Sequence, residues 1–161
     1  MMLIKGILDY VHTDVSGPTK TTSFGGRNYF VSFIDNYSRH TWVYPLRRKD
    51  EVLSTFVMWK KLVENQTGRK ILKIRSNNGG EYTSDSFLQV CRNFGIEHHF
   101  TVRETPQQNG VAERMNQTLV EKVRCMLSTA GVGRQFWAEV LKYACHLVNR
   151  LSSAALEGKL L

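Results

Sequence analysis

The order of the predicted secondary-structure elements is the feature that most restricts the fold of this chain. Three segments rich in β-branched and aromatic residues come before any helix, as in a β-meander. Apolar residues at helical spacing then alternate with two more short β-rich segments. The predicted strands cover about residues 8–15, 28–35, 41–46, 70–76 and 96–100, and the predicted helices about 50–67, 84–94, 109–131 and 134–150. This order predicts an α/β domain with a mixed sheet, whose later strands arrive by helical crossovers.

Two strand ends become neighbours in such a sheet. The fourth strand can lie parallel to and beside the first, which brings Asp14 and Asn77 together at the C-terminal ends. The start of the long helix, with Glu113, can pack over the same edge. Carboxylates that converge there would suit Mg²⁺, which takes oxygen ligands and serves phosphoryl transfer in pairs. Asp14 and Glu113 alone are weak evidence, because acids that face solvent are common.

The charge of the chain favours a polyanionic partner. The 161 residues form one domain and include 22 Lys and Arg against 14 Asp and Glu, a formal charge of +8 with a pI near 9.6. Much of this charge lies between Arg47 and Arg75, in a run that by default is a solvated face. Nucleic acid is the partner that this charge favours, and a globular domain that is simply basic is the alternative.

The cysteines exclude a disulfide framework and a zinc finger. Cys91, Cys125 and Cys145 are odd in number, widely spaced and set in apolar helical patterns, so we expect buried thiols in a reducing compartment. No Cys-x-x-Cys accompanies His98 and His99, which we interpret as ordinary histidines at a strand end. The sequence has no membrane-spanning stretch and no signal peptide, so we expect a soluble, intracellular protein.

Six motifs in order along the chain resemble one known family. They read HTDVSGP, YFVSFIDNYSR, VENQTGRK, RSNNGGEYTS, TPQQNGVAERMNQTLVEKVRCML and FWAEV followed by NR. Together they resemble the catalytic core of retroviral-type integrases, in the form carried by the Pol polyprotein of copia-type LTR retrotransposons. The resemblance covers about residues 8–157 and implies a ribonuclease-H-like fold, with a five-stranded mixed sheet flanked by helices. We therefore expect an integrase core at 1–150 and a truncated C-terminal tail at 151–161.

The resemblance also implies a reaction, a metal cofactor and partners. The family binds two Mg²⁺ or Mn²⁺ ions, which activate water to trim DNA 3′ ends and then activate the trimmed hydroxyl for strand transfer. The implied partners are retroelement ends and target duplex DNA, and the implied assembly is a homo-oligomer. The resemblance places the protein in the nucleus or in a virus-like particle.

The family's metal ligands are two aspartates and a glutamate, and this chain departs from that pattern. Asp14 matches the first aspartate and Glu113 the glutamate. The family places 35 residues between the second aspartate and the glutamate, and that position is Asn77 here. An amide oxygen can ligate Mg²⁺, but it brings no charge. Loss of such a ligand costs on the order of 10²-fold or more in rate, so we expect impaired catalysis.

Three interpretations follow from Asn77. The chain is an integrase core weakened in catalysis, a working strand transferase that tolerates Asn77, or a non-catalytic module for DNA binding or oligomerisation. Asn78 is neutral and cannot replace the missing acid, whereas Glu81 could reach the site across two glycines. Asp35 lies at the far end of the hairpin and is expected to cap a turn.

The expected DNA contacts lie around Glu113 and in the basic run. An amide-rich loop precedes the long helix and suits phosphate and sugar edges, and Asn116 follows Glu113 by one turn. Without the resemblance, these residues would be read as an ordinary loop and helix cap. The expected DNA-binding residues are Lys73, Arg75, Gln107, Gln108, Asn109 and Asn116.

Overall fold

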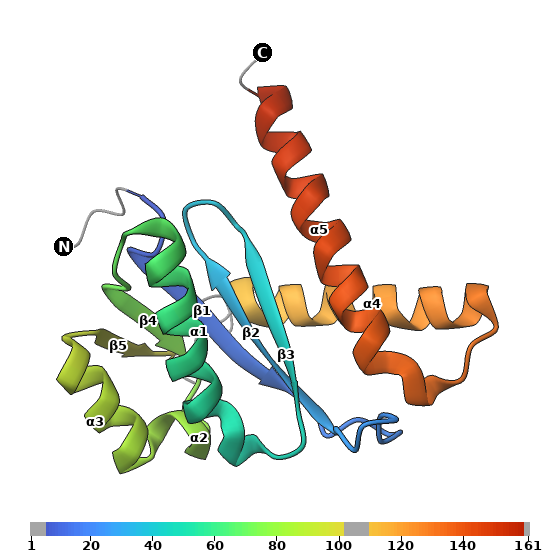
Figure 1. The fold of residues 1–161 in the computed structure, drawn as a ribbon, viewed down its shortest axis with the longest axis horizontal. Coiled ribbons are helices and arrows are strands. Elements are labelled where there is room, and N and C mark those ends of the chain that lie inside the picture. Colours follow the sequence, from blue (N-terminus) through green and yellow to red (C-terminus); the bar gives the residue numbers. More distant parts are fainter. Residues whose placement is uncertain (1–5, 102–109, 160–161) are drawn as a thin grey trace.

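A five-stranded mixed sheet forms the centre of the molecule (Figure 1). The computed structural model describes residues 6–101 and 110–159. The strand order is β3-β2-β1-β4-β5, in which β1, β2 and β3 are antiparallel and β4 and β5 continue parallel to β1. The strands are β1 Tyr10–Ser16, β2 Tyr29–Asp35, β3 Thr41–Leu46, β4 Lys73–Ser76 and β5 Glu97–Phe100. The predicted mixed sheet is confirmed.

Five helices and two short 3-10 turns complete the described fold. The helices are α1 Val52–Thr67, α2 Gly80–Thr83, α3 Asp85–Phe94, α4 Gly110–Ala130 and α5 Trp137–Lys159, and the 3-10 turns are Lys49–Glu51 and Arg134–Phe136. Gly68 ends α1 in the left-handed conformation at φ +68°, as predicted.

Three details of the helices differ from the sequence-based expectations. Asp50 does not cap α1, because a 3-10 turn precedes that helix and the Asp50 carboxylate pairs with Arg48 at 3.2 Å. α5 continues through Lys159, beyond the predicted end at residue 150, because no proline interrupts the following Ser-, Ala- and Leu-rich segment. Cys125 is exposed, since it lies off the buried stripe of α4 that carries Val123 and Leu127. The division into a core at residues 1–150 and a tail at residues 151–161 stays a prediction.

The helices cover both faces of the sheet. On one face, Val31 and Phe33 of β2 pack with α1, and the indole of Trp59 stacks on the ring of Phe33 at 4.2 Å between centroids. On the other face, Phe30 of β2 belongs to a second cluster formed with α4 and α5. Alternate residues of β2 thus supply the two cores, as the period of a strand requires. Figure 1 shows α1 and α4 on opposite sides of the sheet. In the described residues no helix is long and apolar enough to cross a membrane.

Asn149 fastens α5 to the edge of the sheet. Its Oδ1 accepts a hydrogen bond from the Thr41 amide, and its Nδ2 donates to the Thr41 carbonyl, each at 2.8 Å. Thr41 begins the edge strand β3 and is buried. The Asn149 amide therefore bonds two backbone groups at the open edge of the described sheet, and the Cys145 thiol is a second donor to the Thr41 carbonyl at 3.2 Å.

We expect Asn149→Asp to destabilise the fold by about 2 to 3 kcal/mol. The carboxylate removes the amide donor to the Thr41 carbonyl, which keeps the thiol of Cys145 at 3.2 Å, and turns an oxygen toward that carbonyl. Chemical denaturation monitored by circular dichroism measures the change. Arg150→Ala, at the exposed neighbouring position, is the control and should change stability by less than about 0.5 kcal/mol. An unchanged denaturation midpoint in Asn149→Asp would contradict the anchoring role.

Candidate catalytic site

The parallel pairing of β1 with β4 brings Asp14 and Asn77 together. Tyr10 pairs with Lys73 and His12 with Arg75, so Asp14 and Asn77 follow in the same register at the C-terminal ends of the two strands. The Asn77 Nδ2 donates a hydrogen bond to Asp14 Oδ1 at 3.1 Å. The predicted proximity of the two strand ends is confirmed.

The Asp14 carboxylate is buried and receives three N–H groups. Asp14 is 8% exposed. Its Oδ1 accepts from the Val15 amide at 2.9 Å as well as from Asn77, and its Oδ2 accepts from Asn116 Nδ2 at 3.4 Å. Asn116 is itself buried on α4, and its Oδ1 has no hydrogen-bond partner among the described residues. Amide donors therefore surround both oxygens of the carboxylate.

Two neighbours fix the orientation of the Asn77 amide. Its Oδ1 accepts the backbone N–H of Gly79 at 2.9 Å while its Nδ2 donates to Asp14. The reverse orientation would set oxygen against oxygen on one side and N–H against N–H on the other. The group that Asn77 turns toward Asp14 is therefore a nitrogen, which cannot bind a cation.

Two further acids lie within electrostatic range of Asp14. Glu113 is exposed on the first turn of α4, and Glu81 lies in the short helix α2. The Tyr82 hydroxyl, 2.9 Å from Thr13 Oγ1, holds α2 against β1. The Glu81 carboxylate folds back over Gly79, with Oε1 2.6 Å from the position that a Cβ would take there. The sequence-based candidate for a substitute acid is thus close to the strand end.

Burial raises the pKa of Asp14 from 3.8 to about 6. The negative charges of Glu113 and Glu81 add to this effect, whereas the hydrogen bonds from Val15 and Asn116 oppose it. The Asn77 N–H also favours the charged form. The carboxyl can consequently take up a proton just below neutral pH.

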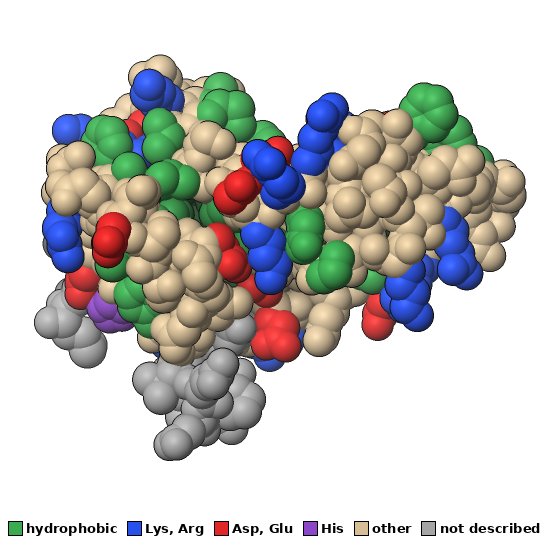
Figure 2. All heavy atoms as spheres, turned by 90° about the horizontal axis from the view of Figure 1, so that it is seen from below, with side chains coloured by type: hydrophobic (Ala, Val, Ile, Leu, Met, Phe, Trp, Pro, Cys, Tyr) green, Lys and Arg blue, Asp and Glu red, His purple; other side chains and the backbone are tan. Residues whose placement is uncertain are grey.

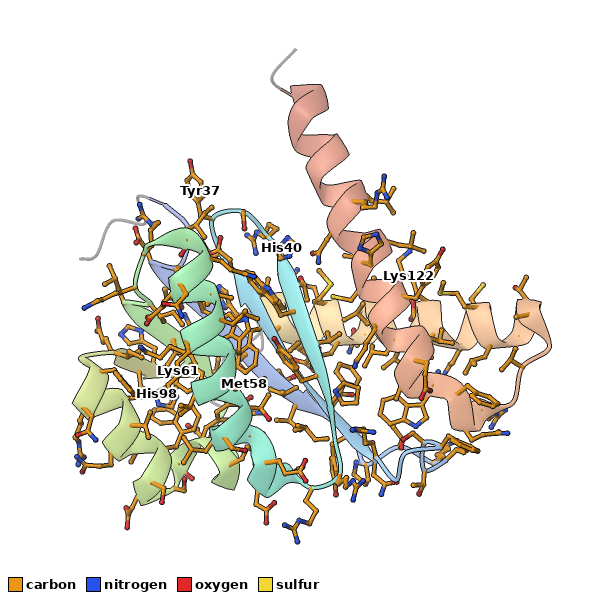
Figure 3. The ribbon with its side chains drawn as sticks, viewed as in Figure 1. Tyr37, His40, Met58, Lys61, His98 and Lys122 are labelled. Atoms are coloured by element: carbon orange, nitrogen blue, oxygen red, sulfur yellow. The ribbon has the colours of Figure 1, made fainter. Side chains whose placement is uncertain are left out.

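A hydrogen-bonded pair, buried Ser76 and half-buried His98, supports the backbone of Asn77 from the other face of the sheet. Ser76 Oγ donates to the Asn77 carbonyl at 2.9 Å and lies 2.7 Å from His98 Nε2. His98 projects from β5 near α3 (Figure 3), and burial lowers its pKa to about 4. The residues predicted from the sequence did not include Ser76, although its position next to Asn77 is a signal that could have indicated it.

The remaining predicted residues lie elsewhere or outside the described chain. Arg75 Nη1 donates to the Tyr10 hydroxyl at 2.8 Å, and Lys73 Nζ lies 4.9 Å from the centre of the Tyr10 ring. Tyr10 begins β1, so both side chains turn away from the strand end that carries Asp14. Asp35 accepts hydrogen bonds from the amides of Leu8 and Ser38, the predicted turn-capping role. Gln107, Gln108 and Asn109 lie outside the described residues.

The arrangement does not fit a pair of divalent cations. Among the residues that the structure describes, no cluster of three His, Cys, Asp or Glu side chains could hold a metal. Both Asp14 oxygens accept N–H groups, and the Asn77 oxygen is bonded to Gly79. The acids that remain near Asp14 are Glu113 and Glu81, neither of which contacts it through a hydrogen bond within the described part of the chain.

Comparison with known proteins identifies the family. The model of the family described as "Integrase core domain" matches residues 8–106. The chain belongs to this family. It is 53% identical over 150 residues to the retrovirus-related Pol polyprotein from transposon TNT 1-94 of Nicotiana tabacum, covering 93% of this chain and 11% of that polyprotein. It is 36% identical over 155 residues to the corresponding polyprotein from transposon RE2 of Arabidopsis thaliana, covering 93% of this chain and 10% of the relative.

Solved integrase structures share the fold. The HTLV-2 integrase catalytic core domain in complex with magnesium, in its trimeric form, superposes with a TM-score of 0.63 at 18% identity, covering 86% of this chain and 82% of that one. A simian T-cell lymphotropic virus intasome in complex with PP2A regulatory subunit B56 gamma gives a TM-score of 0.65 at 18% identity, covering 88% and 50%. The predicted ribonuclease-H-like fold and copia-type family are confirmed. This integrase core spans about a tenth of its curated relatives' length.

We expect Asp14→Asn to stabilise the integrase core at pH 8 by about 2 to 3 kcal/mol and to have little effect near pH 4. The folded protein holds the Asp14 proton more tightly than the unfolded chain does, so this stabilising contribution is complete below pH 4 and is lost as the pH rises through about 6. The substituted amide has no charge to bury, and the free Oδ1 of Asn116 can turn to accept its N–H.

The measurement is the free energy of unfolding in urea at each pH, taken as the difference between variant and wild type. The buried histidines titrate in both proteins and cancel. Asp50→Asn, at an exposed pair with Arg48, is the control and should change stability by less than about 1 kcal/mol. A destabilised Asp14→Asn variant at pH 8 would show that the buried carboxylate is not strained in the folded state.

Proposed function

We propose that this chain is the DNA-processing core of a copia-type integrase whose metal-dependent activity is weakened by Asn77. The family carries out 3′-end processing and strand transfer, and in this proposal Asn77 weakens both reactions. The observation that carries the proposal is the orientation of Asn77, whose nitrogen lies 3.1 Å from Asp14 Oδ1 and whose oxygen is bonded to Gly79. The metal ligand expected at this position is replaced by a hydrogen-bond donor.

The cost of restoring an oxygen ligand supports this proposal. To face a cation, the Asn77 amide would have to turn and give up hydrogen bonds to both Asp14 and Gly79. An aspartate at the same position would keep the Gly79 bond and set its second oxygen against Asp14. Two carboxylate oxygens at that distance repel each other unless a cation lies between them. The native asparagine thus suits the protein without metal, and an aspartate would suit the protein with metal.

Binding of DNA does not depend on residue 77. The formal charge of +8 favours a polyanion, and the partner that the family suggests is duplex DNA. Homo-oligomerisation is part of the proposal, in keeping with the dimeric and trimeric forms in which the HTLV-2 core has been solved. A non-catalytic module for DNA binding or oligomerisation is the second candidate. The orientation of Asn77 favours this second candidate if the chain has no remaining catalytic activity.

We expect Asn77→Asp to gain at least about tenfold in Mn²⁺- or Mg²⁺-dependent nicking of duplex DNA, because it restores a third carboxylate. The assay follows cleavage of an end-labelled duplex with either metal or with chelator. Asn78→Asp adds the same charge one residue away, where the amide bonds the Thr101 carbonyl, and should gain nothing. Strong nicking by the wild-type chain, abolished by Glu113→Ala, would falsify the weakening.

Thermal unfolding gives a second readout of the same substitution. In chelator, Asn77→Asp should melt below the wild type, because its carboxylate faces Asp14 without a cation. Added Mn²⁺ should raise the melting temperature of Asn77→Asp more than that of the wild type. Equal responses of the two proteins to Mn²⁺ would argue against a metal centre at this strand end.

A further inference from the structure

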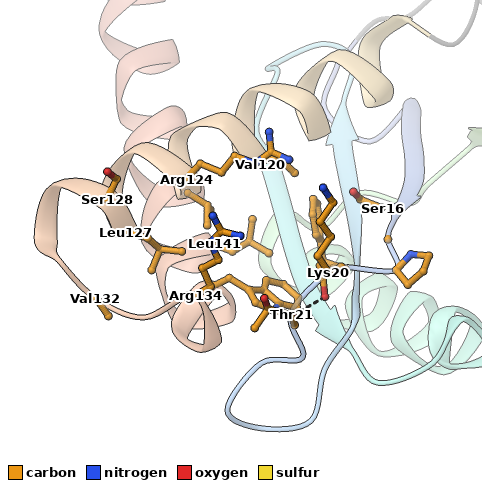
Figure 4. A pocket seen from close by; sticks show the side chains of 16 residues that line it. Ser16, Lys20, Thr21, Val120, Arg124, Leu127, Ser128, Val132, Arg134 and Leu141 are labelled. Carbon is orange, nitrogen blue, oxygen red and sulfur yellow. Dashed lines mark hydrogen bonds between the residues drawn. The ribbon is translucent and has the colours of Figure 1, made fainter.

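A deep cleft lies beside the strand end but outside the candidate catalytic site. It has a volume of about 890 Å³, within the range of ligand sites. Its walls are the loop after β1, the C-terminal half of α4 and the start of α5 (Figure 4). Its floor is apolar and includes Val123, Leu127 and Trp137. Ser16, two residues beyond Asp14 on β1, lies at its edge, so the cleft adjoins the candidate site.

Three cations from three separate segments line this cleft. Lys20 comes from the loop after β1, Arg124 from α4 and Arg134 from the 3-10 turn before α5 (Figure 4). All three residues are exposed, and no Asp or Glu belongs to the lining. None of the three forms an ion pair within the described residues. The cleft therefore presents unneutralised positive charge above an apolar floor.

Backbone and ring contacts hold the loop wall in place. Trp137 Nε1 donates to the Thr21 carbonyl at 3.0 Å, and the Phe24 amide donates to the Gln135 carbonyl at 2.7 Å. The rings of Phe24 and Phe136 stack with centroids 5.8 Å apart. The loop that carries Lys20 is thus tied to the segment that carries Arg134, which reduces the entropy lost when a ligand binds between them.

Gly17 permits the loop to leave β1 in this direction. Its φ is +127°, and a Cβ at this position would lie 2.6 Å from the Asn28 carbonyl oxygen. A larger residue would therefore displace the loop that forms one wall of the cleft. The shape of the cleft is set by β1 itself, the strand that also carries Asp14.

We propose that this cleft binds the phosphodiester backbone of a nucleic-acid strand that extends along α4 from the candidate catalytic site. The inference rests on the proposed function and adds a second contact region to it. Glu113 and Arg124 are separated by 11 residues, about three helical turns, so they lie on one side of α4 about 16 Å apart along its axis. That distance corresponds to about five base pairs of duplex.

Charge and continuity favour a nucleic acid as the occupant. In the face seen in Figure 2, acidic and basic side chains lie close together near the middle, and further basic side chains lie toward both ends. The three cleft cations can each reach a different phosphate, because they come from different segments. The apolar floor can contact sugar carbons. An acidic peptide would use the same cations but has no reason to continue from the cleft to Asp14.

The test compares two triple variants that lose the same charge. The cleft variant combines Lys20→Ala, Arg124→Ala and Arg134→Ala, which removes all three cations from the cleft lining. The control combines Arg92→Ala, Lys142→Ala and Arg150→Ala, three exposed positions outside both the cleft lining and the basic run Arg47–Arg75. Fluorescence anisotropy with a labelled 25-base-pair duplex, titrated at several NaCl concentrations, gives affinity and its salt dependence for each.

We expect the cleft variant to bind duplex on the order of 30-fold more weakly than the control variant at 0.1 M salt. The slope of log affinity against log salt should fall by about 2 to 3, one phosphate for each cation. Equal losses in the two variants would overturn the inference while leaving the proposed function intact. A wild-type chain that fails to bind duplex at low salt would instead refute the proposed function.

Crosslinking gives a readout that does not depend on removing charge. The background substitution is Cys125→Ser, which removes the exposed cysteine. A single new cysteine is then introduced by Ser128→Cys in the cleft wall or by Gln66→Cys at the exposed end of α1. Each new cysteine is labelled with a photoreactive azide. Position 128 should crosslink to the duplex and position 66 should not. If a labelled acidic peptide bound to the cleft and crosslinked at 128 while DNA did not, the occupant would be a peptide and the proposal would be wrong.

Discussion

The parallel pairing of β1 with β4 is the constraint on which the rest of the site depends. It sets Asp14 beside Asn77, and a slip of one residue would turn the Asn77 side chain to the opposite face of the sheet. β4 pairs on its other side with β5, where Ser76 bonds to His98 beneath the Asn77 backbone. The two neighbouring strands therefore fix the backbone position of residue 77, independently of the side chain that it carries.

The fold accepts an amide at position 77 because the amide satisfies both of its neighbours. A buried carboxylate such as Asp14 needs either a cation or several N–H donors. Val15, Asn77 and Asn116 supply those donors here, and no charge has to be brought to the site. The exchange of an acid for an amide thus favours the folded protein without metal and disfavours metal binding. In the proposed function, stability without metal and catalysis with metal make opposite demands on this single residue.

The sequence could predict features that local chemistry determines, and it failed where three-dimensional packing decides. The meander of the first three strands, the proximity of Asp14 to Asn77 and the helix end at Gly68 all follow from periodicity, crossover rules and turn chemistry. The prediction that Cys125 is buried was wrong, because its exposure depends on which side of α4 faces the sheet. Lys73 turns to the ring of Tyr10, a partner on another strand that no motif indicates.

The candidate catalytic site and the cleft share elements but share no side chains that carry their proposed chemistry. β1 provides Asp14 and then, through Gly17, the loop with Lys20, while α4 provides Glu113 at its start and Arg124 three turns later. Substitution at residue 77 changes the ligands at one end of this surface without altering the backbone path to the other. In the proposed function, a chain with an amide at residue 77 can for that reason keep the proposed DNA-binding surface. The proposed effect of Asn77 on catalysis is therefore physically separate from the proposed binding of DNA in the cleft.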